Sequence, residues 1–223
     1  MAGVYSFNSR RKRSVFSLMS VNTLLILINV VTFVIFSILI SLNMLSIDVV
    51  AIKPSNIFRG KYLWTFLTSM FMHGGFFHLF VNMLSMFFVG SLIEKIIGKK
   101  RYIWFYLTSG IFAGLFFVLL SLAIPSDMNA YAVGASGALF GLIGLLMLLT
   151  PNLPVYLMFI PIPIKMKYAA PGILILLWLV SILGDVSIGN TAHLGGLIFG
   201  LIYGFYLRNK YKNKVRHISN QFS

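Results

Sequence analysis

The sequence predicts an all-α polytopic membrane protein: a bundle of six transmembrane helices with both chain termini in the cytoplasm. Of its 223 residues, 59% are hydrophobic and 10% are charged, whereas about a quarter of the residues in a soluble domain are charged. Apolar runs of spanning length recur along the chain. The net charge of +14 comes from cations that gather between these runs, so we expect no nucleic-acid partner but a lipid bilayer around the chain.

The chain is expected to consist of one membrane domain, residues 21–207, between two basic tails, residues 1–20 and 208–223. The first apolar run, residues 21–43, exceeds the roughly 20 residues that a spanning helix needs and shows no small-residue cleavage site, so it is an uncleaved first span. Residues 44–75 are mixed and aromatic, which predicts an interfacial loop with short helices. The five later spans are expected at residues 76–97, 103–124, 135–150, 169–183 and 190–207.

The fourth span is short. A helix over residues 135–150 reaches only about 24 Å at 1.5 Å per residue. It therefore fits best if its start lies below the membrane surface among other helices. Residues 151–167 contain four prolines and read as a connector at the interface.

Lysine and arginine predict the orientation. Both tails, the loop between spans two and three and the loop between spans four and five are basic, while the other side carries only Lys53, Arg59 and Lys61. The positive-inside rule then places both termini in the cytoplasm, in agreement with an even number of spans.

Four polar side chains fall at one depth in this topology. Spans two, four and six run in the same direction, and His78, Asn82, Ser136 and His193 lie in their first turns. Small residues let membrane helices approach closely, and spans four and six carry glycines at steps of three and four. The glycines concerned are Gly137, Gly141, Gly144, Gly196, Gly200 and Gly204. We expect the Ser136 hydroxyl to come within reach of the His193 imidazole.

Each residue alone has a simpler interpretation. A lone serine in a membrane helix usually bonds to its own backbone, and glycines serve packing. A histidine inside a membrane is costly and more often functional. His73 and His78 could bind a metal, but they are five residues apart, the chain has no cysteine, and it has only four acidic residues. We therefore predict neither a metal site nor a cofactor.

These segments resemble the motifs of the rhomboid family of intramembrane serine proteases, over about residues 64–206. Gly134-Ala135-Ser136-Gly137 is similar to the family's GxSG motif. Ala192-His193 with the glycines that follow is similar to AHxxG, and His73, His78 and Asn82 match HxxxxHxxxN. The resemblance implies a six-helix rhomboid-like bundle.

The resemblance also implies roles. Ser136 matches the nucleophile and His193 the general base of a dyad that has no third carboxylate. His78 and Asn82 match the side chains that stabilise the oxyanion, together with the Ser136 backbone N–H, and Gly134 matches a loop glycine beside that site. Glu94 matches a structural acid, and Trp64 a residue of the first loop. Two positions depart from the family: Thr65 stands where arginine often follows the tryptophan, and Phe140 stands where tyrosine often stacks on the histidine.

The chemistry expected is that of a serine endopeptidase, a hydrolase that cuts peptide bonds in or near transmembrane helices of membrane-protein substrates. A neighbouring histidine activates a weak serine nucleophile, and no acid is needed if packing orients the imidazole. We expect a multi-pass protein of the cell membrane whose site opens to the extracytoplasmic side, with the first loop, span five and residues 184–189 as walls; a catalytic role for Asp185 is a minor alternative. An oligomeric state does not follow from the sequence.

Two other functions stay open. Non-catalytic rhomboid-like proteins act as membrane chaperones or dislocation factors, and such relatives lose the serine or the histidine, both of which are present here. A small transporter or channel would carry charged residues along a path through the whole membrane.

Overall fold

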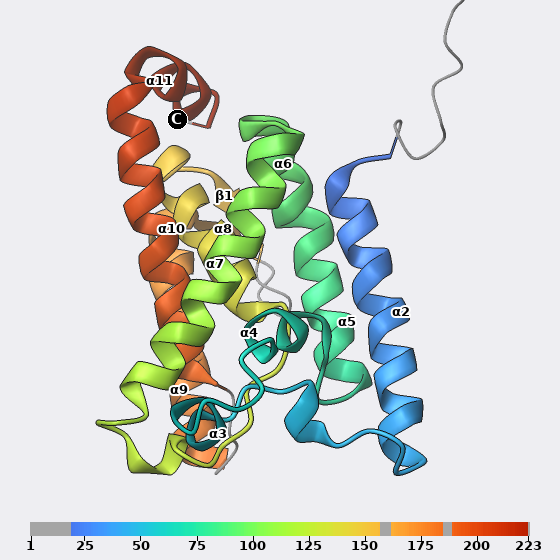
Figure 1. Cartoon of the computed structure of the whole chain (residues 1–223). Helices are drawn as coiled ribbons and strands as arrows, with labels where there is room; N and C mark the ends of the chain where they lie inside the picture. Colours follow the sequence, from blue (N-terminus) through green and yellow to red (C-terminus); the bar gives the residue numbers. More distant parts are fainter. Residues whose placement is uncertain (1–18, 157–161, 185–188, 223) are drawn as a thin grey trace, which may run out of the picture.

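The protein is a bundle of long helices that run alternately in opposite directions (Figure 1). A computed structural model describes residues 19–156, 162–184 and 189–222. In chain order the helices of the bundle are α2 (Val21–Ser41), α5 (Phe76–Ser85), α6 (Ser91–Ile97), α7 (Lys99–Leu120), α8 (Ser136–Leu149), α9 (Met166–Gly184) and α10 (Asn190–Lys210).

Four of these helical segments are long and apolar enough to cross a membrane. They are Val21–Ser41, Phe76–Ile97, Lys99–Leu120 and Met166–Gly184. α8 is apolar but shorter, and α10 is less apolar because it begins with Asn190 and ends with Arg208 and Lys210. The chain is therefore a polytopic helical membrane protein.

The connecting segments contain short elements. They are η1 (Ile47–Val49), α3 (Pro54–Phe58), α4 (Thr65–Thr68), η2 (Ser69–Phe71), η4 (Pro125–Asp127), the paired strands β1 (Pro154–Val155) and β2 (Ile164–Lys165), and the terminal helix α11 (Lys212–Asn220). The sequence predicts a loop with short helices at residues 44–75, and the structure confirms these helices.

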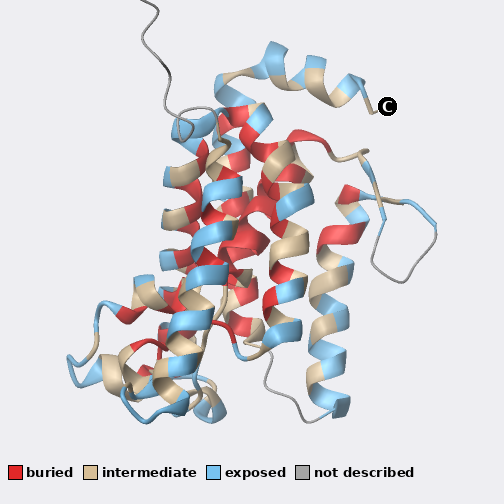
Figure 2. Ribbon diagram, turned by 90° about the vertical axis from the view of Figure 1, so that its right-hand side faces the viewer, coloured by how far each residue is buried: buried red, intermediate tan, exposed pale blue. Residues whose placement is uncertain are grey.

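The core of the bundle lies around α8. Eleven of its 14 residues are buried, and Figure 2 shows the buried residues concentrated along the axis of the bundle. In Figure 1, α5, α8 and α10 run toward the end of the bundle where α11 lies, and α2 and α7 run away from it. That end also carries Lys99, Lys100 and Arg101 at the start of α7, so we call it the basic end.

Helix α8 packs against α10 with the backbones in contact. A Cβ atom at Gly196 would overlap the carbonyl of Gly137, and one at Gly200 would overlap the carbonyl of Gly141. A Cβ at Gly144 would lie 2.5 Å from the carbonyl oxygen of Leu197. Only glycine permits this approach, and the approach brings the first turns of α8 and α10 together.

A polar cluster at the basic end fixes α2. The two carboxylate oxygens of Glu94 accept the backbone N–H groups of Val21 (2.9 Å) and Asn22 (2.8 Å) at the start of α2. Asn22 Nδ2 donates to the Met86 carbonyl (2.8 Å), and Asn22 Oδ1 accepts from the Tyr102 hydroxyl (2.6 Å). These bonds join α2, the α5–α6 segment and α7.

The hydrogen-bonding pattern of the second span changes from α-helical to π-helical next to this cluster. Residues Met86–Gly90, labelled η3, form a π-helical turn between α5 and α6. Such a turn frees backbone groups for other partners, and here the Met86 carbonyl accepts the Asn22 amide. Hydropathy alone does not predict this turn.

Several span boundaries expected from hydropathy were wrong, including the start of α9 at Met166 instead of residue 169. The third span, expected at residues 103–124, is the helix Lys99–Leu120. Gly98, at φ +84°, ends α6 and allows α7 to begin directly with the cations. Likewise α10 continues past residue 207 to Lys210. In both α7 and α10 the helix includes lysine and arginine residues, whose long side chains are compatible with a helical backbone near a membrane surface.

Candidate active site

Ser136 is the first residue of α8, inside the bundle. The turn before it depends on Gly134, whose φ of +118° lies in the region that favours glycine. The Gly134 N–H donates to the Ser69 carbonyl at 2.8 Å, which fixes the turn to η2. The serine hydroxyl thus lies at the N-terminal end of a helix, where the first backbone N–H groups have no partner within the helix.

Ser136 and His193 are hydrogen-bonded. His193 is in the first turn of α10, is 4% exposed, and its Nε2 lies 2.8 Å from Ser136 Oγ. When Nε2 accepts the serine proton, the ring's own proton is on Nδ1. That atom is buried and has no hydrogen-bond partner among the described residues.

An aromatic ring holds the imidazole of His193. Phe140, one turn after Ser136, stacks on it with the ring centroids 4.6 Å apart and the planes 19° from parallel. This packing restricts the orientation of the imidazole. Asp185, the acid nearest to His193 in the sequence, lies outside the described residues.

His78 directs a ring N–H toward the serine. Its Nδ1 accepts the backbone N–H of Gly74 at 3.3 Å, which assigns the ring proton to Nε2. A Cβ built on Gly134 would lie 3.0 Å from this Nε2 and 3.7 Å from Ser136 Oγ. The His78 N–H and the Ser136 hydroxyl therefore flank the same small space, and a side chain at position 134 would fill it.

Asn82 supports this histidine from the next turn of α5. Its Nδ2 donates to the His78 carbonyl at 2.7 Å, and its side chain is 4% exposed. An amide nitrogen has two hydrogens, so one remains for a second acceptor. Asn82 Oδ1 is buried without a partner within the part of the chain that the structure describes.

His73 lies beneath the loop that precedes Ser136. It is 1% exposed, and its Nε2 accepts the Ala135 N–H at 3.4 Å. Its ring is in edge contact with the His78 ring, with the two ring centroids 5.2 Å apart. Burial, and secondarily His78, lowers the pKa of His73 from 6.5 to about 3, so the ring is neutral. His73 matches a motif in the sequence, but no role was assigned to it. Its position as the first residue of that motif was the one feature that could have indicated a place in the site.

The described residues contain no group of three or more His, Cys, Asp or Glu side chains that could hold a metal ion. His73 and His78 meet as two rings in edge contact. Both rings have hydrogen bonds to the backbone of the site.

The first loop lies next to the serine loop. Ile52 and Ala132 form an isolated antiparallel bridge, with N···O distances of 3.1 and 2.9 Å. Trp64 is 55% exposed and its indole N–H donates to the Val49 carbonyl at 2.9 Å. Thr65, where arginine was the expected residue of the family, is buried and bonds the Tyr62 carbonyl at 2.7 Å. The loop is therefore anchored without an arginine.

Together, the fold and the site define a polytopic helical membrane protein in which a serine and a histidine from two closely packed helices share a hydrogen bond. A family model described as the Rhomboid domain matches residues 60–210, which is more than half of the chain. The chain therefore belongs to the rhomboid family, as the motif resemblance predicted.

Relatives from Arabidopsis thaliana agree with this family. The chain is 34% identical to "RHOMBOID-like protein 1" over 162 residues, which are 70% of this chain and 37% of that protein. It is 34% identical to "RHOMBOID-like protein 5" over 151 residues, 65% of this chain and 44% of that protein. It is also 37% identical to "Inactive RHOMBOID-like protein 8" over 139 residues, 61% of this chain and 36% of that protein. The match thus spans less than half the length of these relatives.

Proposed function

We propose that the protein is an intramembrane serine endopeptidase that hydrolyses peptide bonds in or near the transmembrane helices of membrane-protein substrates. The observation that carries this proposal is the 2.8 Å contact between His193 Nε2 and Ser136 Oγ inside a membrane bundle. An isolated serine in such a helix bonds to its own backbone, whereas this one bonds to a base on another helix. Membership of the rhomboid family supports the same reaction class.

In the proposed reaction, Ser136 Oγ attacks the carbonyl carbon of the scissile bond while its proton moves to His193 Nε2. The carbonyl oxygen becomes an oxyanion, which accepts hydrogen bonds from His78 Nε2–H, from Asn82 Nδ2–H and from the Ser136 backbone N–H at the start of α8. His193 then gives its proton to the leaving amine. A water molecule hydrolyses the acyl-enzyme by the same steps, with His193 as the base.

The site's donors are preorganised in this mechanism. The Gly74 N–H holds His78 in the tautomer that donates from Nε2, and Asn82 braces the same turn. Gly134 leaves room for the oxyanion, because a Cβ there would lie 2.8 Å from His78 Cε1. Loss of one such donor raises the barrier by about 3–4 kcal/mol.

The proposal includes a topology. The six spans, formed by α2, α5 with α6, α7, α8, α9 and α10, lie in the bilayer of the cell membrane, both termini are cytoplasmic, and the site opens to the extracytoplasmic side. The concentration of cations at the basic end supports this orientation through the positive-inside rule. In this topology residues 21–207 are the protease domain, between cytoplasmic tails at residues 1–20 and 208–223.

The test is cleavage of a purified single-span substrate in detergent by the wild type, Ser136→Ala and His193→Ala. We expect both substitutions to abolish cleavage. Ser121→Ala is the matched control, because it also removes a buried serine hydroxyl, one that bonds to the Val118 carbonyl of its own helix. Full cleavage by Ser136→Ala would overturn the proposal, provided that the purified sample contains no other protease.

A non-catalytic function is the second candidate, and the relative named as inactive favours it. A fluorophosphonate probe separates the two. An enzyme labels at Ser136 and loses the label in His193→Ala, because the histidine must take the serine proton. A wild type that is folded and does not label would favour the non-catalytic function.

A further inference from the structure

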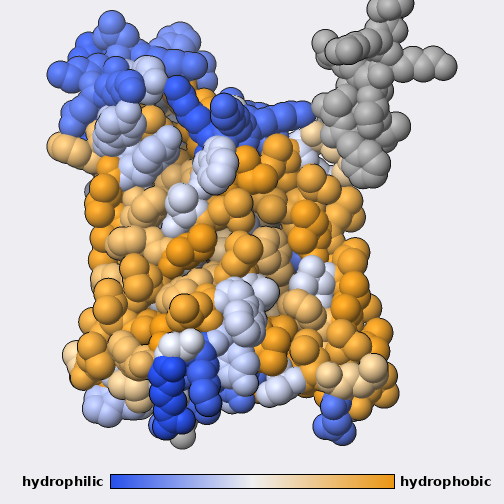
Figure 3. Space-filling view, in the orientation of Figure 1, coloured by the Kyte–Doolittle hydropathy of each residue, from blue (hydrophilic) through white to orange (hydrophobic). Residues whose placement is uncertain are grey.

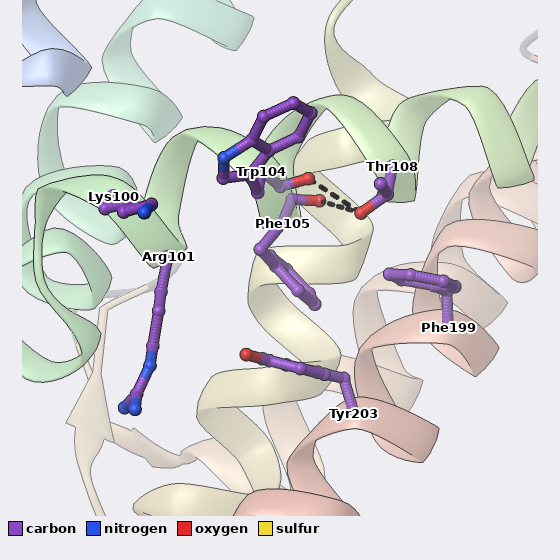
Figure 4. Close-up of a pocket in the computed structure, with 7 residues that line it drawn as sticks. All are labelled: Lys100, Arg101, Trp104, Phe105, Thr108, Phe199 and Tyr203. Carbon is purple, nitrogen blue, oxygen red and sulfur yellow. Dashed lines mark hydrogen bonds between the residues drawn. The ribbon is translucent and has the colours of Figure 1, made fainter.

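A pocket of about 360 Å³ lies between α7 and α10, in the half of the bundle nearer the basic end (Figure 4). Its residues come from the first three turns of α7 and from Phe199 and Tyr203 of α10. None of the active-site residues described above lines it. Its volume is at the lower end of the range of small-molecule sites, about 300–1,000 Å³.

The walls of the pocket are aromatic and apolar. Phe105 packs against Phe199 and Tyr203, with ring centroids 5.7 and 5.1 Å away. Trp104 is 63% exposed at the surface of α7, which is one of the apolar spans. The Thr108 hydroxyl donates to the carbonyls of Trp104 (2.7 Å) and Phe105 (3.2 Å), so its polar atom is satisfied within its own helix. The body of the pocket therefore suits a hydrocarbon chain.

One end of the pocket is cationic. Lys100 and Arg101 lie there, and the Tyr203 hydroxyl points toward the same end (Figure 4). Arg101 donates one N–H to the Tyr211 hydroxyl at 2.9 Å and stacks over that ring at 5.2 Å. A guanidinium has five N–H donors, so several remain for a ligand.

These cations are not neutralised by the nearest acid in the sequence. Both oxygens of Glu94 accept backbone N–H groups at the start of α2. Arg208 and Lys210 add positive charge at the same end of the bundle. Figure 3 shows the face of the bundle as an apolar band below a strongly hydrophilic region at that end.

We propose that this pocket binds a phospholipid with an anionic headgroup. Lys100 and Arg101 bind the phosphate, and an acyl chain lies along Trp104 and Phe199. The ligand must be amphipathic because the pocket changes from cationic to apolar over three helical turns. A soluble anion would leave the aromatic walls exposed. A bilayer lipid would place its headgroup at the cationic end and its acyl chain along the aromatic walls. Basic pockets between membrane helices are typical sites for anionic headgroups. The proposal does not depend on protease activity.

The test uses Trp104 as the reporter. The chain has three tryptophans, so Trp64→Phe with Trp178→Phe leaves Trp104 as the single fluorophore. The full chain is reconstituted in mixtures of phosphatidylglycerol and phosphatidylcholine, with bromine on the acyl chains of one lipid at a time. Bromine quenches tryptophan on contact, so the ratio of quenching by the two lipids gives their relative affinity at the pocket.

We expect brominated phosphatidylglycerol to bind at Trp104 about 25-fold more tightly than brominated phosphatidylcholine, because two cations lie at the pocket. Each cation near the phosphate contributes about a fivefold preference. Lys100→Gln, which leaves the Arg101–Tyr211 contact in place, is expected to reduce the preference about fivefold, and Lys100→Gln with Arg101→Gln to abolish it. Lys165→Gln with Lys167→Gln is the matched control, since it removes the same charge away from the pocket and should leave the preference unchanged.

A second reporter tests the position. A chain with Trp64 as its only tryptophan, at the opposite end of the bundle, should show no preference between the two lipids. Equal quenching of Trp104 by both lipids would overturn the proposal. So would a preference that survives Lys100→Gln with Arg101→Gln, or one that Lys165→Gln with Lys167→Gln removes equally, because that result would indicate a diffuse surface charge instead of a site.

Discussion

Alanine at position 200 tests whether the backbone contact between α8 and α10 sets the geometry of the proposed Ser136–His193 dyad. The Cβ of Gly200→Ala would overlap the Gly141 carbonyl oxygen and lie 2.9 Å from the Leu145 nitrogen. Both neighbours are backbone atoms of α8, so no side-chain rotation relieves the overlap. The helices themselves must move apart.

The size of the movement follows from ordinary contact distances. A carbon and a carbonyl oxygen approach to about 3.3 Å, so α10 must retreat by about 1 Å. His193 lies two turns before Gly200 on the same face of α10, so its 2.8 Å hydrogen bond to Ser136 would lengthen by a similar amount. A contact near 3.8 Å is no longer a hydrogen bond. A displacement of about 1 Å in an active site can cost on the order of 100-fold in rate, and overpacking costs about 1–3 kcal/mol in stability.

Two assays measure the two effects. Cleavage of a transmembrane substrate, or the rate of labelling by a fluorophosphonate, is expected to fall on the order of 100-fold. Unfolding in detergent should show the loss of stability. Gly172→Ala is the matched control, since no atom lies within 4 Å of a Cβ at that helical position. Wild-type rate and stability in Gly200→Ala would refute the view that the close approach of these helices positions the dyad.

Three further predictions concern the surroundings of the site. Phe140→Ala removes the ring stacked on His193 and should lower the rate at least tenfold in the cleavage assay, while Phe140→Tyr keeps the stack and should stay within threefold. Glu94→Gln replaces a carboxylate that accepts two backbone N–H groups of α2, and should cost about 1.5–3 kcal/mol in detergent unfolding, because hydrogen bonds to charged groups are strong. Below pH 6.5 the unfolded chain binds a proton at His73 that the native chain, with a pKa of about 3, does not bind. Stability should therefore fall with falling pH, by about 1.4 kcal/mol per unit from this group, and His73→Gln should make the slope smaller.

Each of these predictions has a result that contradicts it. Equal rates for Phe140→Ala and Phe140→Tyr would mean that stacking does not orient the imidazole. An unchanged unfolding midpoint for Glu94→Gln would mean that the start of α2 does not depend on the Glu94 carboxylate. A slope of stability against pH that is the same with and without His73, measured between pH 7.5 and 5.5, would mean that this ring is not buried neutral.

Much of the fold could be predicted because hydrophobicity and glycine spacing act locally along the chain. The second span, Phe76–Ile97, was predicted at its observed bounds, and the meeting of Ser136 with His193 followed from depth, direction and the glycine spacing of spans four and six. These features depend on where residues fall along a helix, which spacing gives directly.

Other features depend on partners that are distant in the sequence. The π-helical turn at Met86–Gly90 faces Asn22, which is more than 60 residues away. The role of His73 arises from the Ala135 N–H on a loop in another part of the chain. The early start of α7 at Lys99 was missed because a hydropathy criterion leaves lysine and arginine out of a span. A helix can nevertheless include them near its end. The periodicity of residues within one segment does not predict contacts between segments that are far apart in the sequence.

The length of α8 determines how far Ser136 lies below the membrane surface in the proposed topology. Its 14 residues rise about 21 Å, whereas the hydrocarbon layer is about 30 Å thick. In the proposed topology α8 ends at the cytoplasmic membrane surface, so the remaining distance of about 9 Å would place Ser136 below the opposite surface, at the floor of a well that holds the water for hydrolysis. In the proposed function, a substrate helix lying beside the bundle would be cut about six residues below the membrane edge, at 1.5 Å per residue. One extra turn at the serine end of α8 would raise the floor of the well by about 5 Å and move the cut by three to four residues toward that edge.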